Sequence, residues 1–342
     1  TVMLDVYDAS ALPDVTLVGS TTFELPKGLS VTAKGLLWPR PERPSIVLDA
    51  VPTFRFWWGG PVILDRPVLQ TTLKAALAPR LSILPYPQPE RFPYWREKLA
   101  PRIVVFDVTD PTAPLAISNS AIGTDETIPN GVIEAADGLV VVGAGNWKSE
   151  FNGIAYPVGT AAQSVHVIEV PASGSPIVRP GIDLPGELFA VTELDQRGFL
   201  AFTRNSWSDE APSITVSACD GYDAYEISSL EDSAGAVTAA AGRRLFFAKA
   251  GSIARYRLNN DGTWATQPRV SVGWRPGNLR VVDGVLIASD WRRVFAIDAD
   301  AATGGKSWFF PTWGLDAQRI SVAQDGDLLV PFGEYGAERL DR

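Results

Sequence analysis

The chain has 342 residues, of which 46% are hydrophobic and 20% charged, and it carries a net charge of −9. An acidic surface repels phosphates and anionic lipid headgroups, so we expect neither nucleic acid nor an anionic membrane as a partner. No apolar run approaches about 18 residues, so no transmembrane segment is expected. The 30 glycines and 27 prolines are spread along the chain, which is typical of many turns between short strands.

One phrase recurs along the chain: a Pro/Gly turn, an apolar run, a second turn with Gly, and another apolar run. Each run is about five or six residues long, the length of a β-strand. In several copies a third run follows, such as "RIVVFDVTDPTAP" from Arg102, and then a fourth. Four strands per copy and about seven copies predict an all-β fold, a β-propeller of seven four-stranded blades, with six or eight as alternative counts. The copies start at Leu25, Leu69 (a looser one), Ile128, Leu184, Ser233, Arg275 and Leu315.

The two ends of the chain predict how the ring closes. Residues 1–24 resemble the outer strands of a blade, whereas residues 315–342 supply inner strands with little after them. We expect the two segments to complete one blade, so that residues 1–342 form a single propeller domain without free sheet edges. The chain begins "TVMLDVYD", already in a strand, and shows no signal peptide, so we interpret it as a processed product or a fragment of a longer precursor.

The connections from second to third strands are expected to be long and aromatic. Successive turns of a blade alternate between the two faces of the disc, so these connections share one face with the connections between blades. Exposed aromatic residues flanked by Arg, Asn, Asp and Glu are typical of a binding face. Rings that simply pack between blades are the alternative interpretation. The candidate binding residues are Trp38, Trp95, Trp147, Trp207, Trp274, Trp291, Arg292, Trp313 and Tyr335.

We assign no catalytic residue and no metal ligand. The single histidine, His166, lies in the predicted strand "SVHVIEV", where a packed or surface residue is expected, and one Cys with one His cannot form a Cys/His zinc or iron site. Carboxylates on the aromatic face could still form an acid–base site. "NNDGT" at 259–263 resembles part of a calcium loop but is better interpreted as a hairpin turn, which leaves bound calcium open. The carboxylates are Asp209, Glu210, Asp290 and Glu334.

Two phrases resemble those of known repeat families. "DVTDPTAP" resembles the turn of secreted bacterial propellers with LVIVD-type repeats, and "AIDADAATGGKSWFF" from Ala296 resembles a blade motif of quinone-cofactor (PQQ-type) dehydrogenases. The resemblance implies a propeller fold. The quinone enzymes usually have eight blades, repeat the phrase in most of them and often use adjacent cysteines, so its single occurrence here argues against the cofactor. Asp298 and Gly304 are then expected to form a hairpin turn between third and fourth strands.

We therefore expect a non-catalytic interaction or scaffold domain in an extracytoplasmic location: periplasm, cell surface or secreted. It would bind a protein partner through the aromatic face, as a subunit of a larger assembly. The alternative is a carbohydrate-binding or carbohydrate-active propeller, a glycosidase or lyase, in which aromatic residues stack on sugars. A quinone-dependent oxidoreductase is the third interpretation.

Overall fold

The computed structural model is all-β in the part of the chain that it describes. Within this part no helix occurs, and hence none that could cross a membrane. The described residues are 2–11, 14–26, 29–38, 45–52, 54–56, 94–96, 99–107, 110–125, 127–136, 138–146, 148–151, 154–156, 163–171, 175–205, 213–231, 237–290, 292–310, 320–322, 326–331 and 337–342.

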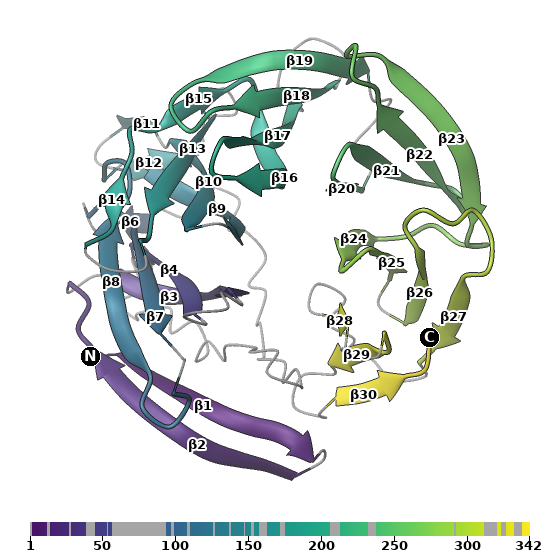
Figure 1. Cartoon of the computed structure of the whole chain (residues 1–342). Coiled ribbons are helices and arrows are strands. Elements are labelled where there is room, and N and C mark those ends of the chain that lie inside the picture. Colours follow the sequence, from purple (N-terminus) through teal and green to yellow (C-terminus); the bar gives the residue numbers. More distant parts are fainter. Residues whose placement is uncertain are drawn as a thin grey trace.

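The sheets follow one another around a ring, as the blades of a β-propeller do (Figure 1). In each sheet of three or more strands the strand that comes first in the chain lies innermost, and the later strands pair antiparallel toward the rim. The first sheet contains β3 (Leu29–Trp38), β4 (Ser45–Pro52), β7 (Arg102–Asp107) and β8 (Leu115–Ala121). The second contains β9 (Thr127–Ala136), β10 (Leu139–Asn146), β13 (Gln163–Glu169) and β14 (Ile177–Val178), with β15 (Ile182–Leu184) also paired to β13.

Three regular four-stranded sheets come next, and a three-stranded sheet follows them. They are β16 (Glu187–Asp195), β17 (Gly198–Asn205), β18 (Ser213–Cys219) and β19 (Ala224–Glu231); β20 (Thr238–Ala241), β21 (Arg244–Lys249), β22 (Ser252–Leu258) and β23 (Trp264–Ser271); and β24 (Asn278–Val282), β25 (Val285–Ser289), β26 (Arg293–Asp298) and β27 (Lys306–Phe309). The last sheet has β28 (Ser321–Val322), β29 (Leu328–Pro331) and β30 (Ala337–Leu340).

The middle strands of the sheets are buried on both faces, because each sheet packs between neighbours. Strand β25 is buried along its whole length, and β21 is buried except at its two ends. These strands are therefore continuous apolar runs rather than alternating ones. The core is divided into layers, each shared by two adjacent sheets; one layer joins β21 to β26 through Phe246 and Phe295.

The all-β propeller architecture is confirmed, but the phrase from Leu25 was divided wrongly. The pattern of this phrase predicts two strands with a turn at Gly35, whereas the structure has one strand, β3, whose register against β4 shifts between Val31 and Gly35. A β-bulge in a continuous strand explains the Gly at this position. The second strand of this sheet is β4, and it pairs directly with β7, although residues 53–101 separate them in the chain.

The count of seven blades is not confirmed. The described residues form six sheets of three or more strands, and the looser copy from Leu69 lies outside them. The N-terminal hairpin, β1 (Val2–Ala11) with β2 (Asp14–Phe23), is a separate sheet that packs against the first blade, where the Phe23 and Phe106 ring centroids are 4.9 Å apart. In Figure 1 this hairpin lies between β8 and β30 at the rim. Closure of the ring by one shared blade of residues 1–24 and 315–342 stays a prediction.

Candidate functional site

The antiparallel order of the sheets divides the ring into two faces. Turns from first to second and from third to fourth strands lie at one end of the strands, which we name the turn face. Connections from second to third strands, and from one sheet to the next, lie at the other end, the loop face. First-to-second turns on the turn face are tight hairpins, at residues 196–197, 242–243 and 283–284.

The second-to-third connections on the loop face vary greatly in length. Residues 250–251 suffice between β21 and β22, and 206–212 join β17 to β18. In contrast, residues 147–162 separate β10 from β13, and 53–101 separate β4 from β7. Variation of this kind on a constant scaffold is typical of the part of a fold that carries function.

The two longest connections fold into ribbons that meet. The first ribbon pairs β5 (Phe54–Phe56) with β6 (Tyr94–Arg96), and the second pairs β11 (Lys148–Phe151) with β12 (Ile154–Tyr156). Strand β6 of the first ribbon contacts β12 of the second. Because the ribbons arise from neighbouring sheets, they form one structure on the loop face, and Trp95 lies in it, in register with Arg55.

A second group of candidate residues meets where β23 leads into β24. The Arg293 guanidinium lies 5.4 Å from the centroid of the Trp274 ring, which also packs against the apolar layer between the two sheets. Oδ1 of Asp290 accepts hydrogen bonds from the backbone N–H groups of Arg292 at 2.8 Å and Arg293 at 2.6 Å. Trp274 thus has a packing role, and Asp290 holds a turn.

Most of the predicted binding residues lie outside the described part of the chain. Among those that are described, Trp38 does not share the loop face, because it ends β3 and the connection after it joins a first strand to a second. Asp209, Glu210 and Glu334 are also outside the described residues. The predicted aromatic binding residues that lie outside the described part of the chain are Trp147, Trp207, Trp291, Trp313 and Tyr335.

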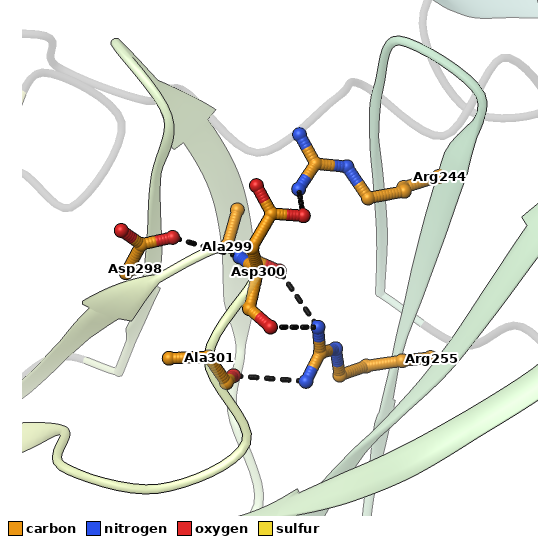
Figure 2. Close-up of polar contacts among 6 residues, drawn as sticks. All are labelled: Arg244, Arg255, Asp298, Ala299, Asp300 and Ala301. Carbon is orange, nitrogen blue, oxygen red and sulfur yellow. Dashed lines mark hydrogen bonds and ion pairs between the residues drawn. The ribbon is translucent and has the colours of Figure 1, made fainter.

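The phrase that resembles the quinone-enzyme motif forms a turn, as predicted, and an arginine from the adjacent sheet holds it (Figure 2). Arg255 of β22 is buried and donates from Nη2 to the carbonyls of Ala299 at 2.8 Å and Asp300 at 3.1 Å, and from Nη1 to that of Ala301 at 2.8 Å. Oδ1 of Asp298 accepts from the Asp300 N–H at 2.8 Å. These hydrogen bonds hold the turn on the turn face.

Other arginines join neighbouring sheets on the same face. Nε of Arg179 donates to Oε1 of Glu169 at 2.7 Å, and its guanidinium lies 4.6 Å from the Tyr222 ring of the next sheet. Nε of Arg243 lies 3.4 Å from Oε1 of Glu193. Sequence reasoning missed these contacts. The feature of the sequence that indicates such contacts is its excess of arginine, 23 residues against 7 lysines, because one planar guanidinium can donate to several acceptors at once.

The turn predicted at 259–263 is also held by its own side chains. Oδ1 of Asp261 accepts from the backbone N–H of Thr263 at 3.0 Å and from its hydroxyl at 2.7 Å. These bonds hold the pKa of Asp261 below its usual value. The carboxylate therefore closes a hairpin turn, as expected.

Three titratable side chains away from the loop face have pKa values moved by burial. His166 is buried, with Nε2 3.3 Å from the Ser164 hydroxyl, and burial lowers its pKa. Burial raises the pKa of Cys219 to about 12. Glu134, on the innermost strand β9, is exposed, yet the surrounding ring reduces its hydration and raises its pKa to about 7, while the positive charge of Arg280 on β24 lowers it. Because the Glu134 side chain is exposed to water, its raised pKa reflects a partial loss of hydration and not complete burial.

Comparisons with known proteins give distant likenesses among solved structures. No family model matches the chain, and no curated protein matches it. Among solved structures, the chain is similar to that of AztD from Citrobacter koseri, with 14% sequence identity over 70% of this chain and 79% of that chain and a TM-score of 0.30.

Proposed function

We propose that this protein is a non-catalytic interaction or scaffold propeller that binds a protein partner through its loop face, as a subunit of a larger extracytoplasmic or surface assembly. One observation carries the proposal: the two longest second-to-third connections, from neighbouring sheets, form ribbons in contact with each other. A connection that only linked strands would be short, as residues 250–251 illustrate.

The difference between the two faces supports this assignment. The turn face consists of tight turns joined by buried or partly buried arginines, so its side chains are engaged in holding the ring together. The ribbons instead add aromatic and basic residues beyond the sheets. Trp, Tyr and Arg carry most of the binding energy in protein interfaces, and all three occur in the segment Tyr94–Arg96.

A ribbon deletion tests the proposal. Residues 148–156 are replaced by a short Gly-Ser linker, and a control variant receives the same linker between Gln196 and Arg197 on the turn face. We expect the wild type and the control to elute as part of a larger assembly from an extract of the native source, and the ribbon variant to elute alone with nearly unchanged thermal unfolding. A ribbon variant that stays in the assembly, or a wild type that elutes alone, would contradict the proposal.

The other two interpretations predict different outcomes for the purified protein. A carbohydrate-binding or carbohydrate-active propeller would bind or cleave a polysaccharide in a glycan screen, and the ribbon variant would lose that activity. A quinone enzyme would absorb light beyond the range of aromatic residues. Either result would replace the scaffold proposal.

A further inference from the structure

The connection that carries the first ribbon has a charge opposite to that of the whole chain. Residues 53–101 contain seven basic and three acidic residues, a net charge of +4, whereas the chain carries −9. Strand β4 pairs directly with β7, so this basic segment leaves one sheet on the loop face and returns to the same sheet. The described strands of this first ribbon carry Arg55 and Arg96 and no acidic residue, and positive charge on an acidic protein points to a negatively charged partner.

Each basic residue of the two ribbons lies directly across from an aromatic residue. In the first ribbon Arg55 pairs with Trp95 and Arg96 pairs with Phe54. In the second ribbon Lys148 pairs with Tyr156. Residues directly opposite in an antiparallel pair lie on the same face of it. The register therefore pairs a basic with an aromatic residue at three positions, and the contact between β6 and β12 brings the two ribbons together.

We propose that the two ribbons bind an acidic, extended segment of a protein partner, an inference that rests on the proposed function. Arginine recognises carboxylates through two parallel hydrogen bonds, and the aromatic residues paired with the basic ones would supply apolar contact area. Within the described residues β5 pairs only with β6, and β11 only with β12. An extended segment that added to such a two-stranded ribbon would gain backbone hydrogen bonds.

The rest of the chain favours a protein segment over a nucleic acid or a lipid surface. Outside residues 53–101 the chain carries a net charge of −13, which repels any long polyanion that extends beyond the ribbons. A short acidic segment can meet the basic positions without approaching that surface. Screening then confines the attraction to about 10 Å at ordinary salt concentrations.

Fluorescence anisotropy with three labelled probes tests this inference on the whole chain. The probes are a peptide of alternating Glu and Val, a peptide of alternating Lys and Val, and an oligothymidine of the same length. The variant R55E/R96E/K148E is compared with R197E/R257E/R269E, which makes the same change of charge at exposed arginines on the turn face and the rim. Thermal unfolding and circular dichroism establish that both variants are folded.

We expect the Glu-Val peptide to bind the wild type and the control, to weaken with added salt, and to bind the ribbon variant about tenfold less tightly or worse. Tighter binding of oligothymidine would assign the site to nucleic acid and overturn the inference. Equal binding by the two variants, or no binding of the acidic peptide, would overturn it as well. If the native assembly persists with R55E/R96E/K148E but is lost on removing residues 148–156, the loop face binds a protein through other contacts, and only this inference fails.

Discussion

Replacing Arg255 by methionine should weaken the junction between the sheets β20–β23 and β24–β27. The guanidinium donates three hydrogen bonds to the carbonyls of Ala299, Asp300 and Ala301 (Figure 2). Methionine retains a flexible, unbranched side chain and much of the apolar contact but has no donor. The variant R255M therefore removes the hydrogen bonds with little loss of packing.

The magnitude follows from the burial of the three acceptors. The bond to Ala299 is buried, and a buried carbonyl that loses its donor costs about 1–3 kcal/mol. The bonds to Asp300 and Ala301 are partly buried, so these carbonyls can turn to water at about 0.5–1 kcal/mol each. Burial also disfavours the Arg255 charge and lowers its pKa, which offsets part of the loss. We expect the free energy of unfolding to fall by about 2–3 kcal/mol.

Arg244→Met provides the matched control, because Arg244 contacts the same turn through the Asp300 carboxylate. The Asp300 side chain is 80% exposed, so this ion pair contributes less than about 1 kcal/mol. Urea unfolding followed by tryptophan fluorescence compares the midpoints of the two variants with that of the wild type. Equal midpoints for R255M and R244M, or an unchanged midpoint for R255M, would refute the reasoning.

Three further substitutions or treatments test other parts of the structure. A Cβ on Gly198 would lie 2.0 Å from the Cys219 carbonyl oxygen, whereas a Cβ on Gly242, at φ +53, would meet open space. Gly198→Ala should therefore lower the free energy of unfolding by about 2–3 kcal/mol and Gly242→Ala by about 1 kcal/mol. Similar urea midpoints for the two variants would contradict this. Because Cys219 is buried with its pKa raised to about 12, it should react with a thiol reagent at pH 8 only after unfolding, and rapid labelling of the native protein would contradict its placement. The pKa of Glu134 rises from 4.5 to about 7 on folding, so its contribution to the free energy of unfolding should fall as the pH rises from about 4.5 through 7. Glu134→Gln should therefore raise the urea midpoint more at pH 8 than at pH 5. An equal effect at both pH values would count against the raised pKa.

The regular blades could be predicted from sequence because their turns carry local signals. Asp283 and Gly284 connect β24 to β25 with φ angles of 47° and 76°, as expected for an Asp-Gly hairpin turn between apolar runs. The turn after Asp298 was predicted for the same kind of reason. Such turn patterns depend only on a few consecutive residues, and so hairpins can be predicted well from sequence.

The features that sequence reasoning missed depend on distant partners. Nothing local distinguishes the bulge near Gly35 from a turn; the pairing of β3 with β4 decides it, and with it the face on which Trp38 lies. Arg255 meets its acceptors 44 to 46 residues away in the chain. The contact between β6 and β12 likewise joins two sheets. Which loops meet on the loop face therefore follows only from the arrangement of the sheets around the ring.

Site-specific photo-crosslinking in the native source tests which of the two faces, the loop face or the turn face, contacts a protein partner. A photoreactive phenylalanine analogue replaces Tyr156 of the second ribbon in one variant and Arg197, an exposed residue on the turn face, in the other. If the loop face binds a protein partner, the Tyr156 variant will form a discrete covalent adduct with one protein, and the Arg197 variant will not. Absence of an adduct at Tyr156, or the same adduct at both positions, would contradict the assignment of partner binding to the loop face.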